Sequence, residues 1–296
     1  MNKNKSSKSF IGVLSLLTVG LLFGLSGVIA KYLSRTINPY QVVEYRFGIA
    51  FIGSLLLLVL LRRKPNFKQF NRKALILFAI TFPISVILFT LSIFHASVAL
   101  AVFSFYSATL ISQFVLGRLF FGEKLNALKG LAFISMLIAI LAFTNPLSHF
   151  SISLGLVFGL LSGVVQGVAS SFQKKLSGSS DKNSLLVIQT FAGAIIAAVI
   201  LLVTDKPLFV NLTGFEWLTA VVFGLSMLAI TYLFLVGYKY VNLNTGSILV
   251  SSELFFGPFF AYILLSENIS TNIFIGGLFT VIAAVLANLP KRESLS

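Results

Sequence analysis

The chain of 296 residues is 57% hydrophobic and only 10% charged, and its mean hydropathy is +0.99. Soluble domains carry about 25% charged residues, so this composition excludes an ordinary soluble enzyme, and the abundant apolar surface excludes a disordered chain. The sequence has no cysteine, which excludes disulfides and thiolate metal sites. Its net charge of +14 would fit a nucleic-acid binder, but in so apolar a chain it favours basic loops at one membrane face.

Ten apolar segments follow one another along the chain, separated by short polar connections. Runs of this length exceed the ~9–11 residues of a barrel strand and match the ~20 residues of a membrane-spanning helix. The first segment follows Lys3, Lys5 and Lys8, but it is longer than a signal peptide's apolar run and no small-residue cleavage site follows, so we predict a retained helix. The predicted spans are 11–33, 39–61, 74–94, 98–121, 126–144, 152–173, 183–203, 215–238, 244–265 and 271–289.

Basic residues orient these predicted helices. If the N-terminus lies in the cytoplasm and the chain crosses ten times, 18 of the 22 lysines and arginines fall on the cytoplasmic side and 3 fall outside. Arg46 lies within a span. Short cytoplasmic loops of membrane proteins carry such an excess of Lys and Arg. We therefore predict a multi-pass protein of the cell (inner) membrane with both termini in the cytoplasm.

The two halves of the chain resemble each other at an offset of about 143 residues. We predict two five-helix repeats, at 10–146 and 151–290. Because five is odd, the second repeat enters the membrane from the opposite side, a device of secondary transporters that bind their substrate near the midplane. Glycines also recur in any packed membrane helix, which is the structural alternative. The matching positions are Gly12 with Gly155, Gly20 with Gly163, Gly24 with Gly167, Lys31 with Lys174, and Glu123 with Glu267.

Several short motifs recur in a recognisable order, namely Asn38-Pro39 before Glu44-Tyr45-Arg46-Phe47, then 94–101, 122–125, and Glu253-Leu254 before Glu267. With the ten-helix frame, the sequence resembles the drug/metabolite transporter superfamily, specifically its EamA-type members, over about residues 10–290. The resemblance implies inner-membrane movement of amino acids, other small metabolites or toxic organic compounds, often outward. Leu254 stands where a proline is common in that family, so the resemblance does not by itself predict a helix break at this position.

Glu253 is the first candidate site residue because it lies about ten residues, or ~15 Å, into the ninth segment. A charge near the membrane midplane costs at least ~2.5–3.5 kcal/mol, so we expect Glu253 to face the bundle interior. An ionised carboxylate attracts an ammonium group and a protonated one releases it. We therefore predict that Glu253 binds substrate and couples transport to protons. The alternative is a packing residue bonded to nearby serines or to backbone.

Glu44 and Arg46 lie in the outer part of the second segment. At 100° per residue they point about 200° apart, so they cannot pair along one helix face. At least one of them is predicted to face the substrate path. Arg46 would then pair with Glu253 or bind a substrate carboxylate, whereas the structural alternative has it reach the outer headgroups.

Four further residues are candidates for substrate contact. Tyrosines combine an apolar wall with a hydroxyl group, and their rings attract organic cations. Intramembrane amides hydrogen-bond either a substrate or a neighbouring helix. The family resemblance places the tyrosine-bearing segments around the central path. The candidates are Tyr106, Tyr232, Tyr262 and Gln113.

No catalytic motif, phosphate-binding loop or room for a nucleotide-binding domain is found in the sequence, so we predict a transporter and not an enzyme. The predicted function is secondary active transport, in the export direction, of small organic metabolites such as amino acids or related amines, with alternating access and proton coupling. An intramembrane enzyme acting on a lipid-linked substrate and a non-transporting membrane scaffold are the alternatives. The expected partners are the bilayer and a small molecule, with no nucleic acid, metal or cofactor, and the oligomeric state is open.

Overall fold

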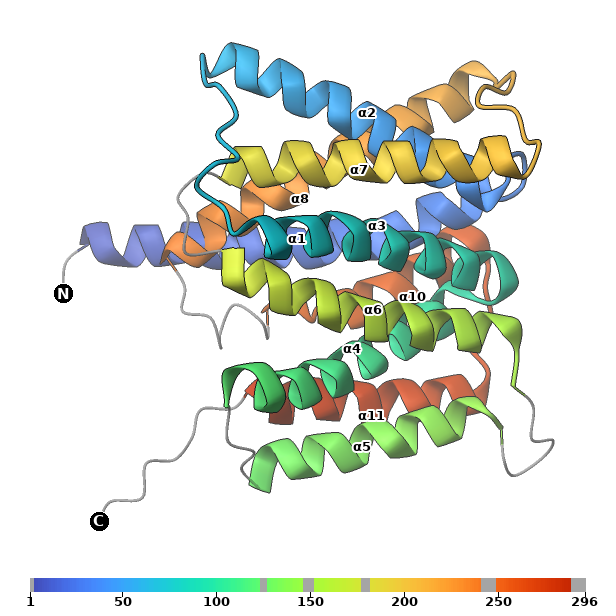
Figure 1. Ribbon diagram of the computed structural model, residues 1–296. Coiled ribbons are helices and arrows are strands. Elements are labelled where there is room, and N and C mark those ends of the chain that lie inside the picture. Colours follow the sequence, from blue (N-terminus) through green and yellow to red (C-terminus); the bar gives the residue numbers. More distant parts are fainter. Residues whose placement is uncertain (1–2, 123–126, 146–151, 177–181, 241–248, 289–296) are drawn as a thin grey trace.

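The computed structural model describes residues 3–122, 127–145, 152–176, 182–240 and 249–288. Over these residues the protein is all-helical, and its helices lie side by side in one bundle, with the start of α1 and the end of α11 at the same end (Figure 1). We call that end of the bundle, where α1 begins, the N face, and the other end the opposite face. The helices are α1 (Lys3–Leu33), α2 (Pro39–Leu60), α3 (Arg72–His95), α4 (Val98–Phe121), α5 (Ala127–Phe143), α6 (Leu154–Leu176), α7 (Lys182–Val203), α8 (Gly214–Tyr240), α10 (Glu253–Leu265) and α11 (Thr271–Asn288).

Each of the ten predicted segments corresponds to a helix of the described chain, which confirms the all-α, polytopic fold class. By length and composition, six of these helices could cross a membrane, and four are shorter apolar helices. The predicted repeat boundaries at 146, 151 and 290 lie outside the described residues.

Local sequence signals set several helix ends. Asn38 accepts hydrogen bonds from the backbone of Gln41, and the Gln41 side chain accepts one from the Asn38 backbone, which forms a capping box at the start of α2. Ser97 caps α4 in the usual way, through the backbone amide of Leu100. Gly122 ends α4 in the left-handed region, with φ of 62°, where glycine carries no steric penalty.

The ninth predicted segment is wrong as a single unbroken helix. Hydrogen bonds from the amides of Ser252, Leu254 and Phe255 reach back only three residues, which tightens the chain into a 3₁₀-like turn before α10. Ser252, which precedes α10, makes no side-chain capping bond, so backbone hydrogen bonds alone define this turn. The remaining α10 has 13 residues, about 20 Å of helix, and is shorter than the ~30 Å hydrocarbon core. The predicted part at 244–248 lies outside the described residues.

Helix packing repeats between the two halves of the chain. Helix α1 packs on α8 as α6 packs on α3, and α1 packs on α10 as α6 packs on α4. The pairs α2–α7 and α5–α11 each join equivalent helices of the two halves (Figure 1). Each helix of one half thus packs on partners equivalent to those of its counterpart in the other half, as expected of an inverted repeat with five helices in each half.

The glycines of α1 and α6 establish the repeat at the level of single residues. A Cβ atom added at Gly20 would overlap the Ser252 hydroxyl, and one added at Gly24 would lie 2.8 Å from the Gly257 amide nitrogen. At the equivalent contact, between α6 and α4, a Cβ at Gly163 would lie 2.8 Å from the Thr109 nitrogen, and Thr109 is offset from residue 253 by 144. A Cβ at Gly167 would crowd Ser112 and Gln113, which the same offset relates to residues 256 and 257. These four glycines therefore lie at close helix contacts.

We expect Gly24→Ala to lower the melting temperature of the purified protein, because its methyl group would press on the α10 backbone. Overpacking of this kind costs about 1–3 kcal/mol. Gly130→Ala is the matched control, since Gly130 is also helical but has no neighbour within 4 Å of the added atom. Removing a helical glycine there should be neutral or stabilising by up to ~1 kcal/mol. Equal melting temperatures for the two variants would contradict the packing account.

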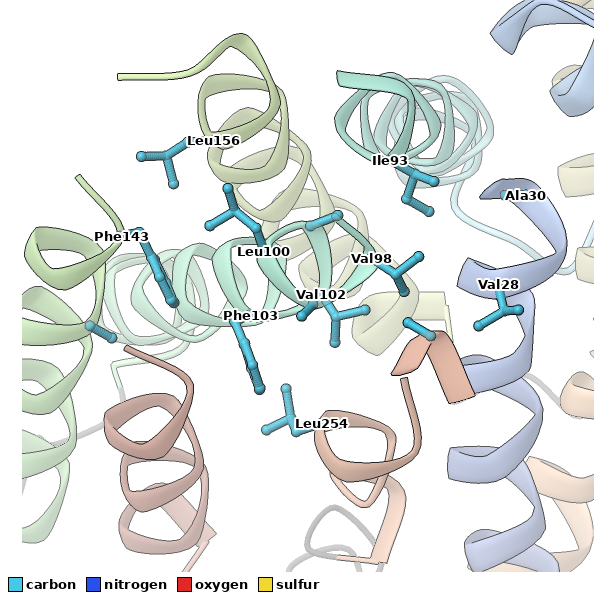
Figure 2. Packing of buried hydrophobic residues seen from close by; sticks show 14 of the residues in the cluster. Val28, Ala30, Ile93, Val98, Leu100, Val102, Phe103, Phe143, Leu156 and Leu254 are labelled. Atoms are coloured by element: carbon cyan, nitrogen blue, oxygen red, sulfur yellow. The ribbon is translucent and has the colours of Figure 1, made fainter. Parts of the chain in front are cut away.

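The main hydrophobic core lies toward the opposite face. Residues 98–103, the first turns of α4, are all buried, and they pack among α1, α3, α6 and α10 (Figure 2). Leu254, the second residue of α10, belongs to the same core. The burial of Leu254 therefore fixes the start of α10 inside the bundle.

Candidate functional site

Glu253 lies near the middle of the bundle. A Cβ built at Gly20 would be 3.2 Å from the Glu253 amide nitrogen, so the two residues lie at the same depth in the bundle. Gly20 lies 10 residues after Phe10 and 13 before Leu33, or about 15 Å and about 20 Å along the helix. Glu253 is half-buried and is the first residue of α10. Its predicted depth is thus retained, although it starts a short helix and does not sit inside a long one.

Two helix contacts nearer the opposite face indicate the depth of Tyr106 relative to Glu253. On α4, Val98 packs against Gly27 of α1, and Val102 packs against Gly257 of α10. Residues four apart share a helix face, so Tyr106 continues this row by one turn toward the N face. Glu253 lies one turn from Gly257 in the same direction. The half-buried Tyr106 and the half-buried Glu253 therefore lie at one level, on facing sides of α4 and α10.

Ser252 adds a hydroxyl group at the same level, which the sequence analysis did not single out as a site residue. Its Oγ atom is buried next to Gly20 and has no hydrogen-bond partner in the described part of the chain. The amides of Leu254, Phe255 and Phe256 at the start of α10 bond back to the carbonyl oxygens of Ser251 and Ser252. Glu253, Ser252 and Tyr106 thus place a carboxylate and two hydroxyl groups at a similar depth of the bundle. We call these three residues the central site.

Arg46 lies elsewhere, between α2 and α8. Its side chain is only 8% exposed, and its guanidinium carbon lies 4.4 Å from the centre of the Phe223 ring. The Nε atom is buried without a hydrogen-bond partner, and Arg46 forms no ion pair with Glu253 or Glu44 within the described residues. A desolvated cation–π contact contributes about 2 kcal/mol, whereas burying a charge costs several kcal/mol. The ring of Phe223 therefore compensates the buried cation only in part.

Glu44 occupies a different face of α2. Phe51, seven residues on and so on the same face, packs on Phe191 of α7 at a ring distance of 5.2 Å. The Glu44 side chain lies along its own helix toward Gly48, and its Oε2 atom is buried without a partner among the described residues. Arg46 faces α8, so Glu44 and Arg46 diverge, as the 200° spacing predicts.

The remaining candidates are dispersed. The Tyr232 hydroxyl donates to Asn183 Oδ1 at 3.0 Å, at the start of α7, which links two helices near the N face. Tyr262 is 60% exposed, and it lies with Phe255 and Phe259 on the outer side of α10. Nine residues separate it from Glu253, a half-turn in helical phase, so it points away from the central site. Gln113 lies farther along α4 toward the N face, where α4 crosses α6 at Gly167.

Two charged residues hold the junction between α3 and α4 at the opposite face. The Lys31 ammonium donates to the carbonyl oxygens of Ile93 and Ala96, at 2.8 and 2.7 Å. Glu267, after the end of α10, accepts a hydrogen bond from the Val98 amide at 2.8 Å. A cation thus meets the C-terminus of α3 and a carboxylate meets the N-terminus of α4, as helix dipoles favour. Glu267 and Lys31 therefore both have structural roles at this junction.

Apolar helices in two inverted repeats, with polar groups at mid-depth, define a polytopic α-helical membrane protein of transporter architecture. The chain belongs to the EamA-like transporter family, which matches residues 10–145 and 153–289, one match for each repeat. An "Uncharacterized transporter" of Clostridium kluyveri is 22% identical over 294 residues, covering 93% of this chain and 92% of that protein. A solved structure titled only "Crystal structure of protein" has a TM-score of 0.66 at 16% identity and covers 98% of each chain, which shows the shared fold.

Family membership confirms the resemblance seen in the sequence and makes the protein a multi-pass membrane transporter of the drug/metabolite type. Its surroundings are the lipid bilayer and its substrate is a small molecule. Membership in a transporter family also indicates a non-enzymatic function. Within the described residues, no group of three or more His, Asp or Glu side chains has an arrangement that could hold a metal ion.

Proposed function

We propose that this protein is a secondary active exporter of small organic metabolites such as amino acids or related amines, with Glu253 as the group that binds both substrate and proton. The observation that supports this proposal most strongly is the position of Glu253. It starts a short helix in the middle of the bundle, next to the buried Ser252 hydroxyl and across from Tyr106. Transporters typically place their binding groups at such a broken helix near the membrane midplane.

Glu253 offers the simplest form of proton coupling. An ionised carboxylate attracts the ammonium group of a substrate, and the hydroxyls of Ser252 and Tyr106 are suited to accept further N–H donors. Protonation removes the charge and releases the amine. One carboxylate that binds either a proton or a cation, but not both, makes the two fluxes run in opposite directions without a separate ion site.

Alternating access follows from the repeat. The contacts of Gly20 and Gly24 with α10 reappear in the other half as contacts of Gly163 and Gly167 with α4. Two halves with equivalent but inverted interfaces can exchange conformations by rocking against each other. The structure has its opposite face tightly packed, since the first turns of α4 are buried and the α3–α4 junction is held by Lys31 and Glu267. We propose that this face is the outer one and is closed in this conformation.

The proposed orientation places both termini and the loop around Lys68 in the cytoplasm, and the loop between α7 and α8 outside. Single cysteines at Lys68 and Asn211 can be labelled without background, because the native chain has no cysteine. A membrane-impermeant thiol reagent added to intact cells should modify the cysteine at 211 and spare the one at 68, by at least tenfold in rate. The reverse pattern would mean that the protein is inserted the other way round.

The transport proposal is tested by solute flux in proteoliposomes that contain the purified protein and an imposed pH gradient. Solute movement against its own gradient, in the direction opposite to the protons, supports coupled export. Flux that ignores the pH gradient would contradict proton coupling, and no flux for any amine or amino acid would contradict the substrate class.

A further inference from the structure

Arg46 is a buried cation for which the described structure supplies no anion. Its side chain is more than nine-tenths buried, its Nε–H has no acceptor, and no carboxylate forms an ion pair with it in the described part of the chain. Glu44, the nearest acidic residue along α2, lies on another face of that helix. A guanidinium group has five N–H donors, and a buried one requires acceptors.

Arg46 is also separated from the central site. It lies seven residues after Pro39, the first residue of α2, which is about 10 Å from the opposite end of the bundle. Glu253 shares its level with Gly20, about 20 Å from that end along α1. The two charged groups therefore stand at different depths, roughly 10 Å apart along the bundle.

We propose that the guanidinium of Arg46, backed by the Phe223 ring, is a second binding station that takes the carboxylate of a small organic acid or of a zwitterion. The proposal rests on the proposed transport function and extends it by naming an anionic group that the substrate carries. The Phe223 ring covers one face of the guanidinium plane, so a ligand is left the N–H edge. A carboxylate matches that edge with two parallel hydrogen bonds, one of which uses the unsatisfied Nε–H.

The two repeats differ at this station. Arg46 lies in the first repeat, and the offset of 143 that relates the halves brings it onto Gln189 in α7. An uncharged amide cannot attract a carboxylate in the same way. The proposed station therefore belongs to the first repeat alone, nearer the opposite face than Glu253.

The test uses three small probes built on the same two-carbon skeleton: propionate carries only the acid, ethylamine only the ammonium, and alanine both. The measurement is the melting temperature of the purified protein at constant ionic strength, because a ligand that binds the folded state raises it. Propionate should stabilise the wild type saturably, and chloride should not. Arg46→Gln should weaken the propionate response at least tenfold, and Arg35→Gln, which removes an exposed cation, should leave it unchanged.

Further variants separate the possible outcomes. Arg46→Lys keeps the charge and loses the planar fork, so it should weaken propionate binding about fivefold or more; it also serves if the glutamine variant does not fold. Glu253→Gln should abolish the ethylamine response and retain the propionate response, so failure at either site is recognised separately. An unchanged propionate response in both Arg46 variants would overturn the proposal. Equal stabilisation by chloride would also overturn it, because Arg46 would then be a simple halide site.

Discussion

Glu253→Gln is expected to reduce pH-gradient-driven solute flux by at least tenfold while the protein still inserts and remains monodisperse. Glutamine keeps the shape of the side chain and removes both the charge and the titrating proton. Without them the central site cannot exchange an ammonium group for a proton. The loss should appear as flux that no longer depends on the imposed pH gradient in proteoliposomes, with the wild type measured beside the variant.

Glu44→Gln is the matched control for this experiment. Glu44 is the other glutamate within a membrane-spanning helix at a half-buried position, but it lies along α2 toward Gly48 and away from α10. Its replacement should change the flux by less than about twofold. If Glu253→Gln transports normally and keeps its pH response, Glu253 is a packing residue and the central site is misassigned.

Lys31→Met is expected to loosen the packing of the opposite face. The Lys31 ammonium makes two hydrogen bonds to carbonyl oxygens at the end of α3, and methionine can make neither. Hydrogen bonds of a charged group contribute about 1.5–3 kcal/mol each, and 1.4 kcal/mol is a factor of ten in an equilibrium. A cysteine introduced at the buried Ala99 should therefore react at least tenfold faster with an impermeant thiol reagent in the Lys31→Met background.

The control for this effect is Lys206→Met. Lys206 is an exposed cation between α7 and α8, on the same face, and its replacement changes the surface charge without touching the α3–α4 junction. It should leave the labelling rate of the cysteine at 99 unchanged. Equal rates in the wild type and in Lys31→Met would mean that the bonds of Lys31 do not keep this face closed.

Much of the fold was predictable, because a membrane limits the chain to a few solutions. Every backbone polar group in the hydrocarbon core must be satisfied, so long apolar runs become helices and polar residues mark their ends. Asn38 before Pro39 and Ser97 before α4 are start signals with a direct physical meaning, and both cap their helices. The break before α10 was missed because residues 249–255 contain no proline or glycine to mark it, and only the backbone hydrogen bonds reveal it.

The candidate site was predictable to a lesser degree. Glu253 and Arg46 stood out because charges are costly in an apolar run, and both lie inside the bundle. Tyr262 was misplaced although its helical phase, a half-turn from Glu253, was readable from the sequence. Ser252 and Phe223 carried no signal, since hydroxyl groups and phenyl rings are common along this chain and only the packing of helices shows which of them meet a charge.

The central claim is that one mid-depth site is reached alternately from the two sides of the membrane. Ser252→Cys tests it directly, because Ser252 adjoins Glu253 and the native chain has no other thiol. An impermeant thiol reagent should label this cysteine in right-side-out vesicles and, separately, in inside-out vesicles. A saturating amine substrate should slow labelling from both sides. Labelling from one side only, whatever the pH or substrate, would contradict alternating access at this site.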